Sequence, residues 1–152
     1  MASAPAAART TLHIERTFGA SRERVFEAWT DPELFARWFT PPGGSSANAE
    51  IDLRVGGTWS VTMKPPLWPS GRGFGTYLEV DPPARLVFTI AWEGFPNGPQ
   101  SLVSVEFHEL DGATKVELVQ ERLGTRRGRW AHKRGWRHSL ERLREVVEAS
   151  AS

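Results

Sequence analysis

Hydrophobic positions near the C-terminal end of the chain repeat with the period of an α-helix. At about 3.6 residues per turn, one line within residues 128–147 contains Trp136, Leu140, Leu143 and Val147. The opposite side is charged, so the pattern predicts a long amphipathic helix. Continued toward the N-terminus, the apolar line reaches His132, Lys133 and Arg129. Such a helix can pack a core with its second half and cover a cavity with its first.

Alternating apolar and polar positions predict strands over most of the remaining chain. The first strand covers residues 10–18. Two short helices follow at 21–29 and 32–39, with Ser21 and Asp31 as their expected N-caps and Pro32 at the first position of the second helix, which stops at Pro41-Pro42. Six more strands are expected at 47–55, 58–64, 74–80, 85–92, 102–110 and 114–121. Gly56-Gly57 and Asp111-Gly112 are the residue pairs that tight hairpin turns prefer. The glycines of residues 71–75 are assigned to a hairpin loop.

Each predicted strand has an apolar side and a polar side. Trp59, Val61 and Met63 share one side, whereas Glu106, His108 and Glu117 belong to the opposite one. This pattern favours one curved antiparallel sheet that is covered on one side, and the terminal helix is the obvious cover. We therefore expect an α+β fold with seven antiparallel strands, formed by a single domain over residues 10–149 after a disordered tail at 1–9.

The composition narrows the functional classes. The chain has 152 residues with a net charge of +1, so no global field attracts it to nucleic acid or to anionic membranes. No apolar run approaches the roughly 20 residues of a membrane span. The absence of cysteine excludes disulfides and thiolate–metal sites and fits a reducing cytoplasm, which is the expected location.

Four segments, spread over most of the chain, are similar to a known family. They are RTFGASRERVFEAWTDPELFARWF, IDLRVGGTW, GTYLEVDPPARLVFT and the Gly135-Trp136 helix with its leucines. They resemble the AHSA1-type branch of the START-like (SRPBCC) superfamily, named after the eukaryotic activator of the Hsp90 ATPase. The resemblance implies a helix-grip (START/Bet v 1-like) fold, in which a seven-stranded sheet grips the C-terminal helix around a cavity for apolar molecules. The basic stretch 122–137 departs from the family pattern.

Inward-facing side chains are the candidate ligand-binding residues, although large aromatic residues also form ordinary cores. His132, one helical turn before Trp136, is the candidate polar contact. Gly135, inside the helix, would allow close approach by a ligand or a strand. The full predicted set is Trp29, Trp38, Trp59, Val61, Met63, Tyr77, Phe88, Trp92, Phe107, His132 and Trp136.

No catalytic or metal site is predicted, and no cofactor is implied. His132 and His138 lie six residues apart, about 240° around a helix, and cannot share a metal ion. His13 and His108 belong to strands that are far in sequence from both of these histidines. No nucleophile has a base at suggestive spacing, and the chain has no Gly-x-Ser-x-Gly motif.

Three functions follow from these observations. The first is the binding of a small, largely apolar molecule between the sheet and the terminal helix. The second is a protein-interaction module acting on an Hsp90-type chaperone, with Arg126, Arg127 and Arg129 facing an acidic partner. The third is a cyclase- or hydrolase-like enzyme using the same cavity. The missing nucleophile–base pair makes this hypothesis less favoured than ligand binding.

Overall fold

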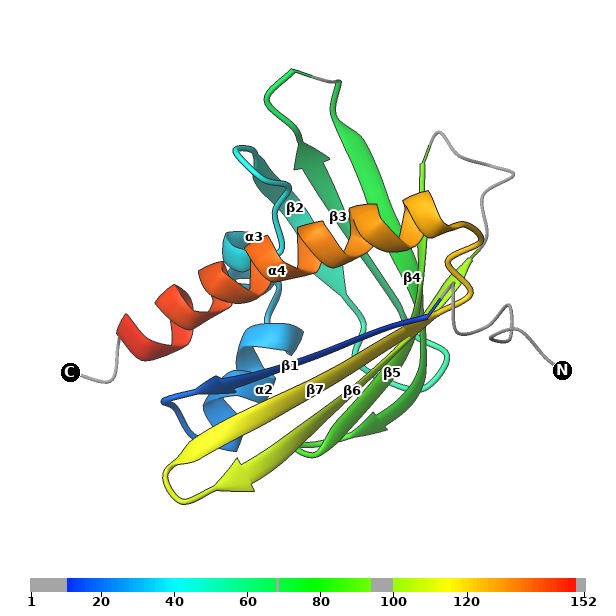
Figure 1. Cartoon of the computed structure of the whole chain (residues 1–152). Helices are drawn as coiled ribbons and strands as arrows, with labels where there is room; N and C mark the ends of the chain where they lie inside the picture. The colour runs from blue at the N-terminus through cyan, green and yellow to red at the C-terminus, as the bar shows by residue number, and fades with distance from the viewer. Residues whose placement is uncertain (1–10, 68, 94–99, 150–152) are drawn as a thin grey trace, which may run out of the picture.

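The structure, a computed structural model, describes residues 11–67, 69–93 and 100–149 (Figure 1). Its elements are, in chain order, β1 (Leu12–Phe18), α2 (Arg22–Thr30), α3 (Pro32–Trp38), β2 (Ser45–Ile51), β3 (Thr58–Lys64), β4 (Gly71–Asp81), β5 (Arg85–Trp92), β6 (Ser101–Leu110), β7 (Ala113–Glu121) and α4 (Arg126–Glu148). The tail predicted at residues 1–9 lies outside the described residues.

The seven strands form one antiparallel sheet in the order β1-β7-β6-β5-β4-β3-β2. Consecutive strands pair from β2 to β7, and β1 joins the far edge beside β7, with Leu12 opposite Gln120. Helix α4 crosses the curved sheet, and α2 and α3 lie under its C-terminal half (Figure 1). The predicted α+β helix-grip architecture is therefore confirmed.

Side-chain caps define where the three helices begin. The Ser21 hydroxyl accepts a hydrogen bond from the Arg24 amide at 3.2 Å, and the Asp31 carboxylate accepts one from the Leu34 amide at 3.1 Å. Both caps follow the predicted pattern. Thr125 caps α4 in the same way, so this helix starts at Arg126, two residues before the predicted boundary.

Two turn assignments were tested by the sheet, with opposite results. Asp111-Gly112 closes a two-residue hairpin as predicted, with Leu110 opposite Ala113. The tight turn predicted at Gly56-Gly57 is wrong, because β2 ends at Ile51 and residues 52–57 form a longer loop. The two glycines instead exchange backbone hydrogen bonds with Tyr77 of β4, at 2.8 and 2.9 Å.

The assignment of residues 71–75 to a hairpin loop is also wrong, since β4 begins at Gly71. Two of its glycines are required by close packing. A Cβ at Gly73 would lie 2.7 Å from the Trp92 ring, and a Cβ at Gly75 would overlap the Thr89 carbonyl oxygen. Glycine therefore serves here to let a neighbouring strand approach closely.

The core lies between the sheet and the second half of α4. Leu140, Leu143 and Val147 are buried there, as the apolar line predicts. The centre of the core is aromatic: the Trp29 ring lies 4.6 Å from that of Trp38 and stacks on that of Trp136 at 5.8 Å. This packing holds α2 and α3 against the helix and leaves the first half of α4 to meet the other end of the sheet.

A candidate ligand cavity under helix α4

A cavity of about 570 Å³ lies between the first half of α4 and the ends of β3, β4 and β5. Most of its lining is apolar. It includes Phe39 after α3, Met63 on β3, Ile90 and Trp92 on β5, and four prolines from the loops, Pro41, Pro42, Pro65 and Pro69. A volume of a few hundred cubic ångströms with an apolar lining is typical of small-molecule sites.

The side chains of α4 explain why this end of the fold is hollow. Where the second half of the helix presents leucines to the core, the first half presents Ala131 and Gly135 to the cavity, beside His132 and Trp136. A Cβ added at Gly135 would meet no heavy atom of the described structure within 4 Å, apart from its chain neighbours and the backbone of its own helix. The small side chains therefore leave space that larger ones would fill.

Trp92 forms a flat wall of the cavity on the sheet side. Its ring lies over Gly73, its partner across the β4–β5 pair. On the other side the Phe39 ring stacks nearly parallel to it, with centroids 6.4 Å apart and planes 7° apart. The two aromatic rings are thus held in place before any ligand arrives.

One hydrogen bond joins the helix to the sheet across the cavity. The indole N–H of Trp92 donates to Nε2 of His132 at 3.1 Å, and Nδ1 of His132 donates to the Gly128 carbonyl oxygen at 2.8 Å. Since an indole can only donate and a carbonyl can only accept, these partners select the neutral imidazole protonated on Nδ1. Burial lowers the pKa of His132, which keeps it in this neutral form.

Charged groups lie at the mouth of the cavity. Arg72 and Glu93 both line it and form a loose ion pair with a nitrogen–oxygen distance of 3.9 Å. Both side chains are about half exposed, so the pair adds little stability. Together with His132 they are the titratable side chains among the described residues of the lining.

The structure divides the predicted site residues into two groups. Met63, Trp92, His132 and Trp136 line the cavity. The other seven lie outside its lining, buried in the core: Trp29, Trp38, Trp59, Val61, Tyr77, Phe88 and Phe107. Alternation along a strand shows that a side chain points inward. It does not show whether that side chain lies under the first half of α4, where the cavity is, or under the second half.

Several lining residues were not predicted from the sequence. Phe39 was assigned to a helix, and Pro41 and Pro42 were taken only as the stop of that helix. The available signal was the concentration of prolines in the two loops at this end, at residues 41–42 and 65–69. Their location at one cavity mouth depends on the pairing of β2 with β3.

A second depression of about 870 Å³ lies between α3, β2 and the end of α4. Although larger, it is lined by charged side chains, among them Glu33, Arg37, Arg142 and Glu145. It lacks the aromatic walls of the cavity under α4. We therefore take the cavity under α4 as the candidate ligand site.

The basic residues at the start of α4 have different surroundings. Arg126 and Arg127 are exposed, whereas Arg129 is partly buried and donates from Nε to the Thr11 carbonyl oxygen at 2.7 Å. Trp130, which follows Arg129, is 61% exposed, and the Arg134 guanidinium lies 5.7 Å from its ring centre. No helix in the described parts of the chain is long and apolar enough to cross a membrane.

The sheet, the gripped helix and the cavity define a START-like helix-grip protein. The family model for activator of Hsp90 ATPase homolog 1-like proteins matches residues 19–148, and the chain belongs to this family. Membership supports ligand-binding or Hsp90-associated roles in general. No protein among the curated sequences matches the chain.

Solved structures agree with this assignment. Protein CV1439 from Chromobacterium violaceum is 26% identical, with a TM-score of 0.83 over 91% of this chain and 98% of that chain. A protein from Arthrobacter aurescens has the same TM-score at 20% identity, over 95% of this chain and 90% of the other. An HSP90 activator from Plasmodium falciparum is 24% identical, with a TM-score of 0.71 over 92% and 96%. The last two similarities concern the fold.

Proposed function

We propose that this chain is a cytoplasmic binding protein that holds one small, largely apolar molecule between its sheet and the first half of α4. The observation that carries the proposal is the cavity of about 570 Å³ with aromatic and proline walls at that position. Burying the apolar surface of a ligand there contributes about 25 cal/mol per Å². The few polar groups in the lining would orient the ligand.

The predicted residues take different parts in this proposal. Met63, Trp92 and Trp136 would contact the ligand, and His132 would lie beside it. The seven core residues would support these walls from behind. Trp29, for example, stacks on Trp136, and the Trp59 indole donates to the Thr89 carbonyl oxygen at 3.0 Å.

Binding without turnover fits the lining better than catalysis. Both ring nitrogens of His132 are engaged, one with Gly128 and one with Trp92. Arg72 and Glu93 lie at the mouth, where water reaches them. A bound compound recovered chemically unchanged after long incubation is the expected result, and its conversion to a product would favour the enzyme.

Native mass spectrometry and a thermal-shift panel of lipid-like and polyketide-like compounds test the proposal. A ligand that binds the folded state raises the unfolding midpoint in proportion to its saturation. Gly135→Leu would place a side chain in the cavity and should abolish the shift. Arg137→Leu, which places the same side chain on an exposed position of α4, should preserve it.

The binding proposal fails if no compound shifts the wild type and the purified protein carries none. It also fails if Gly135→Leu binds as tightly as Arg137→Leu, since the ligand then lies elsewhere. Because both variants introduce leucine into α4, a difference between them reports the cavity and not the helix.

A second function, action on an Hsp90-type chaperone, is supported by the surface at the start of α4. Trp130 is an exposed aromatic residue with Arg126, Arg127 and Arg134 around it, and no acidic residue lies between Arg122 and Arg137. An aromatic anchor among cations suits an acidic protein partner. Arg129 contributes less than predicted from sequence, because its guanidinium is bound to the backbone of residue 11.

The chaperone hypothesis is tested by measuring stimulation of the chaperone's ATPase. Arg126→Glu with Arg127→Glu, or Trp130→Ala, should remove any stimulation, because these side chains are exposed and free to reach a partner. Arg16→Glu, on strand β1 and outside the basic surface at the start of α4, is the charge-reversal control. A wild type without effect on the ATPase, or loss with the control alone, would count against this role.

A further inference from the structure

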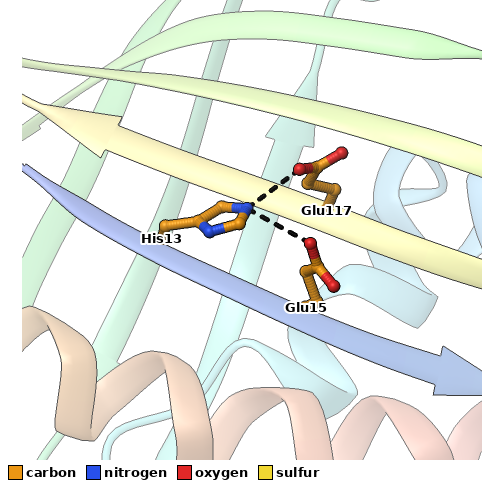
Figure 2. A group of neighbouring side chains, drawn as sticks. All are labelled: His13, Glu15 and Glu117. Carbon is orange, nitrogen blue, oxygen red and sulfur yellow. Dashed lines mark hydrogen bonds and ion pairs between the residues drawn. The ribbon is translucent and has the colours of Figure 1, made fainter.

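The outer face of the sheet carries a cluster of histidine and glutamate side chains, on the side opposite α4. His13 and Glu15 of β1 alternate with the buried Leu12 and Ile14, so they point away from the core. Figure 2 shows the His13 ring between the carboxylates of Glu15 and of Glu117 on β7. No local pattern in the sequence brings them together, because His13 and Glu117 lie 104 positions apart.

The spacing of the three side chains fits a metal ion. Nε2 of His13 lies 2.9 Å from Oε2 of Glu117 and 3.6 Å from Oε1 of Glu15. The single proton on this nitrogen can bond only one of the two carboxylates. An ion with bonds of about 2.1 Å to nitrogen and oxygen separates neighbouring ligand atoms by about 3.0–3.4 Å, so it would satisfy all three groups after small movements.

Strand register concentrates negative charge at this place. Glu15 lies directly opposite Glu117, which lies directly opposite Glu106 on β6. Like charges at directly opposite positions destabilise a sheet. Glu106 is compensated by the Arg85 guanidinium at 3.3 Å, whereas the nearest ammonium to Glu15 is that of Lys115, at 4.0 Å. The excess of carboxylate charge therefore lies at the Glu15–Glu117 end, where His13 is.

A second histidine orients the central carboxylate. Nε2 of His108 lies 3.1 Å from Oε1 of Glu117, the oxygen that faces away from His13. A hydrogen-bonded partner behind a ligating carboxylate is a regular feature of metal sites in proteins.

We propose that His13, Glu15 and Glu117 bind a divalent transition-metal ion such as Zn²⁺, with His108 positioning Glu117. One imidazole and two carboxylates favour Zn²⁺, Ni²⁺ or Cu²⁺ over Mg²⁺ and Ca²⁺, which prefer oxygen ligands alone. Water completes the coordination, since the site is open to solvent and His13 is half exposed. The ion neutralises the opposed carboxylates and links the edge strand β1 to β7. No metal site was predicted from the sequence, and the proposal departs from that prediction because strand pairing brings His13 and Glu117 together.

The proposal is tested with tag-free full-length protein, stripped with a chelator and titrated with zinc chloride in a calorimeter. We expect one zinc ion per chain and an unfolding midpoint that rises with zinc concentration. His13→Ala and Glu117→Gln should each weaken binding more than tenfold. His108→Ala should weaken it about tenfold, as loss of an orienting partner does. Both histidines are exposed enough for these variants to fold, which circular dichroism checks.

His138→Ala is the matched control, since it removes a histidine on α4 that bonds Thr40 instead. It should bind zinc as the wild type does, and magnesium chloride should give no saturable heat with any variant. The proposal is overturned if zinc binding does not saturate, if it survives His13→Ala and Glu117→Gln, if it is lost in His138→Ala, or if magnesium binds equally well.

Discussion

Replacing Gly135 by alanine measures directly whether the first half of α4 covers an empty space. Glycine inside a helix costs about 1 kcal/mol relative to alanine, because it loses more conformational freedom on folding. This gain is realised only if the new methyl group has room. The Cβ position at Gly135 has no heavy atom of the described structure within 4 Å, apart from its chain neighbours and the backbone of its own helix. Gly135→Ala should therefore stabilise the protein by about 1 kcal/mol.

The assay is chemical and thermal unfolding of ligand-free protein, followed by circular dichroism. For a chain of this length, a gain of about 1 kcal/mol corresponds to a midpoint about 3 °C higher. Gly112→Ala is the matched control: its Cβ also has open space, but φ is +76°, so alanine should cost about 1–2 kcal/mol there. The reasoning is refuted if Gly135→Ala destabilises the protein, because the methyl group would then meet atoms where the structure has a cavity.

Three further outcomes are expected. Trp136→Phe should cost about 1–3 kcal/mol in urea unfolding, because it leaves the buried side-chain amide oxygen of Gln120 without the indole donor that now lies 2.8 Å away. An unchanged midpoint would contradict that bond. Burial lowers the pKa of His132, so as the pH falls the imidazole is protonated in the unfolded chain before it is protonated in the folded protein. The free energy of unfolding should therefore decline below about pH 6.5, and His132→Gln should flatten this decline. Identical pH profiles of the two proteins would contradict the effect of burial. Gly75→Ala should destabilise the protein by on the order of 3 kcal/mol, because the added methyl group clashes with the Thr89 backbone. Gly71→Ala, with open space at its Cβ, should be nearly neutral. Equal melting temperatures of the two variants would disprove the close approach of β5 to Gly75.

Local patterns predicted most of the fold correctly, because their causes act over a few residues. The caps at Ser21 and Asp31 and the hairpin at Asp111-Gly112 depend on neighbours in the chain. Where a glycine contacts a strand that is distant in sequence, the turn predicted from its neighbours in the chain was wrong. Gly56 bonds Tyr77, and Gly75 makes room for the backbone of β5, so neither conforms to the turn that its own neighbours suggest.

The sequence by itself determined the architecture: one apolar side on each strand, a helix that is aliphatic in one half and polar in the other, and aromatic residues pointing inward. It could not decide which of those aromatic residues line a cavity, because periodicity shows the direction of a side chain and not its position along the interior of the fold. Nor could it decide that His13 and Glu117 meet on the outer face, since the pairing of β1 with β7 joins the two ends of the domain. Both sites arise where residues from distant segments are brought within a few ångströms, and only the tertiary structure sets those distances.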